Sequence, residues 1–176
     1  FGILLIDVDN LKAVNDIYGH QAGDSLLKGL AVRISKTLTQ PQTLARLGGD
    51  EFAVALPEVS EPATLVEVAG SIHAALVAPI SCGQMQLTAS VSIGAALSSS
   101  ELNTYDALVA ASDTALYAAK AAGKRQFRLF GQHLDHTAIP TSDVRGWRSA
   151  LHPISFLLQE MSGPAAPPLP GQSERP

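Results

Sequence analysis

The sequence of 176 residues has little of what marks several large protein classes. Its single cysteine, Cys82, excludes an intrachain disulfide framework and a zinc site built from cysteines. We therefore expect a neutral thiol in a reducing compartment, and hence a cytoplasmic domain. Charged residues make up only 16% of the chain, and the net charge is -4. An acidic chain is unsuited to covering a nucleic-acid backbone, so we expect no nucleic-acid partner.

Long apolar runs are also missing from the sequence. No run reaches the length of about 20 residues that a membrane-spanning helix requires. The N-terminus has no basic region followed by an apolar stretch and a cleavage site. The chain starts on a strand-like run without an initiator Met, so we interpret it as a fragment of a parent protein that could be membrane-tethered. What the chain does have is an apolar fraction of 46%, enough for a sizeable core.

Hydrophobic patterns divide residues 1–130 into alternating strands and helices. The expected strands are 1–8, 43–47, 52–56, 87–97 and 127–130, and the expected helices are two within 11–38, broken near Gly19, and one each over 63–78 and 104–122. The order β-α-α-β-β-α-β-α-β predicts one α/β domain over residues 1–130, in which helices flank a mixed sheet. The strand over 87–97 is expected to be half-buried, because larger apolar residues alternate with small polar ones.

The composition changes after Gly131. Seven of the eleven prolines lie between Pro140 and Pro176, and the last dozen residues are mostly Pro, Gly, Ala and polar types. We therefore expect residues 131–176 to form a Pro-rich, largely disordered tail.

Two aspartates lie at the end of the first predicted strand at a spacing of two residues. In extended backbone Asp7 and Asp9 would point to the same side, where their mutual repulsion would favour a hard divalent cation such as Mg²⁺. The alternative is that Asp9 and Asn10 form a turn or cap the following helix. From these residues alone the two interpretations have about equal weight.

A second acidic group lies at the predicted hairpin Gly48-Gly49-Asp50-Glu51. Glycines lack Cβ atoms, so a phosphate could approach this turn closely, although an ordinary surface turn would have the same composition. If strand 1–8 lies beside the hairpin, Asp7, Asp50 and Glu51 would converge on one metal site suited to phosphoryl or nucleotidyl transfer.

Cations are available for such a site. Lys120 and Lys124 are four residues apart near the end of the last predicted helix and are therefore expected on one face. Lys12 follows the first acidic pair, and Arg46 precedes the Gly-Gly turn. The alternative for the two helix lysines is a solvated helix end, where the helix dipole favours cations.

Several spaced motifs run along residues 1–130: Asp7-Val8-Asp9-Asn10-Leu11-Lys12, Asn15-Asp16, Gly19-His20, Gly23-Asp24, Leu27, Arg46-Leu47-Gly48-Gly49-Asp50-Glu51-Phe52, Ser92-Ile93-Gly94, and Asp113, Ala115, Tyr117, Ala119, Lys120 and Gly123. Together they resemble the GGDEF family of diguanylate cyclases. The resemblance implies a palm-like fold related to nucleotide cyclases and polymerases. It also implies condensation of two GTP into cyclic di-GMP with release of two pyrophosphates, by a homodimer in which each subunit holds one GTP.

The resemblance implies a role for each matching residue. Mg²⁺, with Mn²⁺ as an alternative, would be held by Asp7, the carbonyl of Val8 and Asp50. Asp50 with Glu51 beside it would help deprotonate the 3′-hydroxyl. The remaining substrate contacts would be Asn15 and Asp24 on guanine, Lys12, Lys120 and Lys124 on the terminal phosphates, and Gly48 and Gly49 at the turn.

Two departures from the family pattern qualify this expectation. The last phosphate-binding position, often Arg in the family, is Lys124 here, which keeps the charge and loses bidentate contact. The segment that family members carry before the first strand is absent, so we describe residues 1–130 as an N-terminally truncated domain. An upstream sensor or regulatory domain is expected in the parent. The alternative function is a weak or inactive GGDEF domain that binds GTP and regulates a neighbour.

Overall fold

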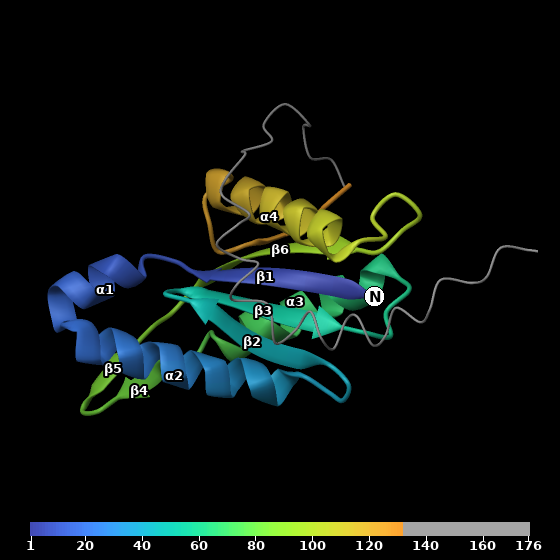
Figure 1. Ribbon diagram of the computed structural model, residues 1–176. Helices are drawn as coiled ribbons and strands as arrows, with labels where there is room; N and C mark the ends of the chain where they lie inside the picture. Colours follow the sequence, from blue (N-terminus) through green and yellow to red (C-terminus); the bar gives the residue numbers. More distant parts are fainter. Residues whose placement is uncertain (132–176) are drawn as a thin grey trace, which may run out of the picture.

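The computed structural model describes residues 1–131, and the predicted tail lies, apart from Gly131, outside the described residues. A five-stranded mixed sheet forms the centre of the domain, with helices on both faces (Figure 1). The strands run in the order β2-β3-β1-β6-β7 across the sheet: β2 is Thr43–Gly48, β3 Glu51–Leu56, β1 Gly2–Val8, β6 Val91–Leu97 and β7 Phe127–Leu129. The central strand β1 is antiparallel to both neighbours, and β7 is parallel to β6. The expected mixed α/β sheet is confirmed.

Four helices cover the two faces of the sheet: α1 (Leu11–Tyr18), α2 (His20–Thr37), α3 (Pro62–Ala75) and α4 (Tyr105–Ala121). The break between α1 and α2 falls on Gly19, whose φ of 82° is open to glycine and disfavoured for other residues. The hydroxyl of Thr104 caps α4 by accepting from the backbone N–H of Ala107 at 3.3 Å. The break at Gly19 agrees with the sequence-based expectation. Within residues 1–131, none of the helices has the length and apolar character needed to span a bilayer.

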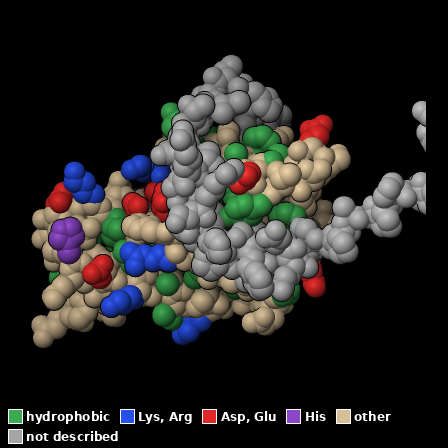
Figure 2. Space-filling model, viewed as in Figure 1, with side chains coloured by type: hydrophobic (Ala, Val, Ile, Leu, Met, Phe, Trp, Pro, Cys, Tyr) green, Lys and Arg blue, Asp and Glu red, His purple; other side chains and the backbone are tan. Residues whose placement is uncertain are grey.

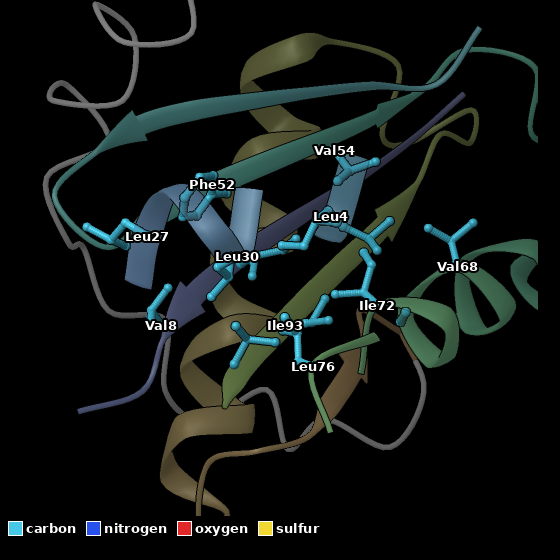
Figure 3. Packing of buried hydrophobic residues seen from close by; sticks show 14 of the residues in the cluster. Leu4, Val8, Leu27, Leu30, Phe52, Val54, Val68, Ile72, Leu76 and Ile93 are labelled. Carbon is cyan, nitrogen blue, oxygen red and sulfur yellow. The ribbon is translucent and has the colours of Figure 1, made fainter. Parts of the chain in front are cut away.

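The apolar residues form two cores, one on each side of the sheet. Alternate residues of β1 separate between them, because successive side chains of a strand point to opposite faces. Leu4, Ile6 and Val8 pack with α2 and α3, as the close-up of this core shows for Leu4 and Val8 (Figure 3). Ile3 and Leu5 pack with Leu108 and other residues of α4. Odd-numbered residues of β1 therefore face α4, and this includes Asp7.

The region between α3 and β6 differs from the expectation. A separate two-stranded sheet, formed by β4 (Ile80–Cys82) and β5 (Met85–Leu87), was not predicted as a hairpin. The predicted strand over 87–97 is interrupted after Leu87 and resumes at Val91. Residues 91–96 are buried on both faces, so the prediction of a half-buried strand is wrong. The physical reason is that helices cover this part of the sheet from both sides.

Candidate active site

The centre of the candidate site is Asp7, at the carboxyl end of β1. Asp7 lies opposite Glu51 of β3 in the strand register, so their side chains share the face of the sheet that α4 covers. From α4, the Lys120 ammonium approaches to 2.6 Å from Asp7 Oδ2. Only 9% of Asp7 is exposed. A half-buried cation and a buried carboxylate thus meet where β1, β3 and α4 come together.

The hairpin between β2 and β3 brings Asp50 to the same end of β1. Gly49 has a φ of 50°, in the left-handed region that glycine adopts without steric cost. Two contacts hold the turn: the N–H of Val8 donates to the carbonyl of Asp50 at 3.0 Å, and Arg46 donates to the carbonyl of Gly49 from Nε at 3.2 Å and Nη2 at 2.7 Å. The backbones of β1 and the turn are therefore joined beside the carboxylates.

The electrostatics of this corner follow from burial and from like charges. Burial raises the pKa of Asp7 above its ordinary value, and the charges of Asp50 and Asp9 raise it further, against the opposing effect of Lys120. The pKa of Glu51 is raised mainly by burial and then by Asp50 and Asp7. The carboxylates therefore repel one another at neutral pH, and a divalent cation among them would relieve that repulsion.

The raised pKa of Glu51 predicts a gain of stability from Glu51→Gln. When the pKa of a carboxyl group is higher in the folded state than in the unfolded state, the free energy of unfolding falls as the pH rises through these pKa values. Glu51→Gln should therefore melt about 1–3 °C higher than wild type at pH 7, and the difference should shrink towards about pH 3, where the Glu51 carboxyl group is protonated in both the folded and the unfolded chain. Thermal unfolding at both pH values measures it, with the exposed Glu67→Gln on α3 as the control. A lower melting temperature at pH 7 would contradict the repulsion.

The side chain of Asp9 makes its hydrogen bonds away from the group formed by Asp7, Glu51 and Lys120. Its Oδ1 accepts from Ser92 Oγ at 2.7 Å, and its Oδ2 accepts from the backbone N–H of Arg125 at 3.2 Å. Asp9 and Asn10 form a turn before α1, as one of the two alternatives predicted, but the side chain of Asn10 makes no capping hydrogen bond to the helix. The sequence did not point to Ser92 as a partner, since the pairing depends on where β6 lies beside β1.

Asn15 and Gly23 meet where α1 and α2 pack together. Asn15 Oδ1 is buried and has no hydrogen-bond partner among the described residues. A Cβ atom at Gly23 would lie 1.9 Å from this oxygen, so glycine is needed to make room for the Asn15 amide. Asp24, the next residue, is exposed on α2. An unpartnered amide oxygen beside an exposed carboxylate leaves hydrogen-bond acceptors for the N–H groups of a ligand.

The lysines are arranged differently from the expectation. The structure ends α4 at Ala121, so Lys124 is not on the helix, and the prediction that Lys120 and Lys124 share one helix face is wrong. Lys124 lies in the following loop with a φ of 63°, and its Nζ donates to Asn10 Oδ1 at 2.8 Å. Lys12 is exposed on α1. Figure 2 shows basic side chains next to acidic ones on the face in view.

No group of three or more His, Cys, Asp or Glu side chains in residues 1–131 is arranged to hold a metal ion. The set expected from the sequence, two carboxylates and one carbonyl, is smaller than such a group. Asp7 and Val8 lie at the end of β1 and Asp50 in the turn between β2 and β3, and the hydrogen bond from Val8 to Asp50 joins these two segments. All are hard oxygen donors of the kind that Mg²⁺ prefers, so the residues present fit the ion.

A pocket of about 640 Å³ lies elsewhere around α1. Its lining includes Ile17, Tyr18 and Val77, together with Asp9 and Arg125. Asp7, Asp50 and Asn15 are not in the lining. We therefore do not include this pocket in the candidate site.

Comparison with known proteins decides the family. Residues 1–126, more than half of the chain, match the family model described as diguanylate cyclase, GGDEF domain. The chain belongs to the GGDEF family. The turn at Gly48–Phe52 is thus the signature for which the family is named, and the family is that of the diguanylate cyclases.

Relatives and solved structures agree with this assignment. Diguanylate cyclase TpbB of Pseudomonas aeruginosa is 39% identical over 72% of the chain, and cyclic di-GMP phosphodiesterase PdeR of Escherichia coli is 40% identical over 73%. These matches span only 29% and 19% of the two relatives. The crystal structure of the GGDEF domain of TpbB superimposes with a TM-score of 0.71 at 38% identity, covering 73% of this chain and 81% of that one. The palm-like GGDEF domain fold is therefore confirmed.

Proposed function

We propose that this GGDEF domain is a diguanylate cyclase that condenses two GTP into cyclic di-GMP and two pyrophosphates. The observation that carries the proposal is the meeting of Asp7, Asp50 and Glu51 beside Lys120 at one corner of the sheet. Such a corner combines anionic donors for a metal with a cation for a phosphate. The family and the relative named diguanylate cyclase support the same activity.

Asp7, the carbonyl of Val8 and Asp50 would hold Mg²⁺, or Mn²⁺ in its place. The bound ion would hold the triphosphate and lower the pKa of the attacking hydroxyl. Lys120 is paired with Asp7 in the structure, and a cation at Asp7 would weaken that pair and free the ammonium for a phosphate oxygen. Lys12 and Lys124 would contact the terminal phosphates, and Gly48 and Gly49 would allow the chain of phosphates to approach the turn.

Proton removal from the 3′-hydroxyl is assigned to Asp50 with the help of Glu51. A general base works best when its pKa lies near the working pH, and burial together with neighbouring carboxylates raises the pKa of Glu51 in that direction. Guanine would be recognised by Asn15 and Asp24. A carboxylate can accept from both N1–H and N2–H₂ of guanine, a pair of donors that adenine does not present.

Catalysis is proposed to need two chains. Each chain would hold one GTP, so joining two nucleotides in a ring requires that two sites face each other. The chain spans less than a third of the two curated relatives described above, and an upstream sensor or regulatory domain is proposed for the parent protein.

The direct test is incubation of the purified chain with GTP and Mg²⁺, followed by mass spectrometry for cyclic di-GMP. We expect product with GTP, none with ATP, and none after EDTA removes the metal. Titration of Mn²⁺ into the EDTA-treated sample should restore the product. Absence of product from a chain that is folded and dimeric would contradict the proposed activity.

A second function is favoured by one observation. PdeR, a relative of similar identity, is named a phosphodiesterase, so GGDEF domains of this similarity occur in proteins with another named activity. The alternative is a domain that binds GTP and regulates a neighbour without making cyclic di-GMP. Calorimetric binding of GTP without product would support this alternative.

A further inference from the structure

The loop between α4 and β7 has an uncommon backbone conformation. Gly123, Lys124 and Arg125 have φ angles of 110°, 63° and 52°. Glycine adopts this region freely, whereas the Cβ atoms of Lys124 and Arg125 disfavour it. Consecutive residues of this kind persist only where surrounding contacts hold them. The loop therefore needs an anchor outside itself.

Asp9 provides such an anchor. One carboxylate oxygen accepts from the backbone N–H of Arg125 at 3.2 Å, and the other accepts from Ser92 Oγ at 2.7 Å. Asp9 is only 7% exposed, and its own N–H donates to the carbonyl of Ser90 at 2.9 Å. Hydrogen bonds to a carboxylate are stronger than neutral ones. The buried carboxylate thus joins the end of β1 to both β6 and the loop.

The anchored loop carries Lys124. The N–H of Lys124 donates to the carbonyl of Ala119 at 3.1 Å, which connects the loop to α4. Its Nζ lies 2.8 Å from Asn10 Oδ1, directly before α1. Because Lys124 is outside the helix, α4 alone does not determine where its ammonium group lies. The bond between Arg125 and Asp9, one residue further on, fixes the loop relative to the carboxyl end of β1.

We propose that Asp9 is a positioning residue that sets the place of Lys124, and through it the affinity of the site for the terminal phosphates of GTP. The proposal rests on the proposed function, because it takes GTP as the ligand of Lys124. Asp9 acts through the backbone of residues 124 and 125. The ligands proposed for the metal are Asp7, Val8 and Asp50, whereas both oxygens of Asp9 accept hydrogen bonds from β6 and from the loop.

Two substitutions of Asp9 separate these roles. Asp9→Ala removes both hydrogen bonds and frees the loop. Asp9→Asn removes the charge but keeps the bonds, because the amide oxygen can accept from Arg125 and the amide nitrogen can donate to Ser92 Oγ. For the full chain, we expect Asp9→Ala to weaken GTP binding about tenfold. GMP lacks the terminal phosphates, so its dissociation constant should stay within about twofold of the wild-type value. Asp9→Asn should bind both nucleotides nearly as wild type does.

Arg125→Gly supplies a rescue. Glycine accepts a φ of 52° without steric cost, so the double variant Asp9→Ala/Arg125→Gly should recover most of the GTP affinity lost in Asp9→Ala. Glu67→Ala, at an exposed position on α3, serves as the control and should bind GTP as wild type does. Hydrogen exchange over residues 123–126 gives a readout without nucleotide. Protection of the Arg125 amide should be lost in Asp9→Ala and kept in Asp9→Asn.

Three outcomes would overturn the proposal. Equal weakening by Asp9→Asn and Asp9→Ala would mean that the charge itself acts on the metal or the nucleotide. Equal losses for GTP and GMP, or unchanged GTP binding in Asp9→Ala, would disconnect Asp9 from the terminal phosphates. If the wild-type chain binds no GTP, the proposed function fails instead, and the exchange measurement alone decides whether Asp9 holds the loop.

Discussion

Asp50→Ala is expected to reduce the formation of cyclic di-GMP by at least about a thousandfold. The substitution removes one of the two carboxylates proposed to hold the metal and the group proposed to receive the proton of the 3′-hydroxyl. The loss should appear in the turnover number under saturating GTP and Mg²⁺, measured by quantifying the product over time.

The fold should survive this substitution. The carbonyl of Asp50, not its side chain, accepts the hydrogen bond from Val8, and the turn is held further by Arg46 on the carbonyl of Gly49. We therefore expect the melting temperature of Asp50→Ala to stay within about 2 °C of wild type. Glu67→Ala, at an exposed position on α3, is the control that should keep full activity. A folded Asp50→Ala that still makes a tenth of the wild-type product would remove Asp50 from the mechanism.

Much of the fold could be predicted from local patterns. The apolar run of β1 indicated a strand, and Gly19 marked the break between α1 and α2, because both signals depend on neighbouring residues only. The β4–β5 hairpin escaped prediction because each of its strands has only three residues. Periodicity cannot be recognised in so short a run.

The prediction for β6 failed for a different reason. Ser92, Gly94 and Ala96 alternate with larger apolar residues, which resembles a strand with one solvent-exposed face. In the structure these three residues lie opposite Asp7, Leu5 and Ile3, on the face that α4 covers. Their small size lets α4 approach the sheet closely. The small residues of β6 are therefore needed for packing against α4, whereas the sequence pattern indicated that they face solvent.

The candidate site shows the same division between local and distant information. The convergence of Asp7 and Glu51 was expected only on the condition that β1 and the hairpin pair, and the register of the two strands meets that condition. The place of Lys124 could not be inferred from helical spacing. Gly123 leaves the helix with a φ of 110°, and the contact that holds the next residues comes from Asp9, more than a hundred positions earlier.

Gly94→Ala is expected to be strongly destabilising, because α4 leaves no space for a side chain there. A Cβ atom at Gly94 would lie 2.1 Å from the backbone nitrogen of Leu116 and 2.3 Å from the carbonyl oxygen of Ser112. These are backbone atoms, so the helix as a whole would have to move away from the sheet. We expect a loss of about 3 kcal/mol in the free energy of unfolding, or a melting temperature lower by ~10 °C.

The same displacement should weaken the site, because Lys120 lies one turn beyond Leu116 on α4 and reaches Asp7 from there. Any Gly94→Ala protein that remains folded at low temperature should therefore bind GTP less tightly than wild type. Gly70→Ala is the matched control, since Gly70 is an exposed glycine in α3 whose added Cβ would meet nothing within 4 Å. Alanine should be neutral there or stabilise the helix by about 0.5–1 kcal/mol. Equal stability of Gly94→Ala and Gly70→Ala in denaturant unfolding would contradict the close approach of α4 to β6, and with it the placement of Lys120 beside Asp7.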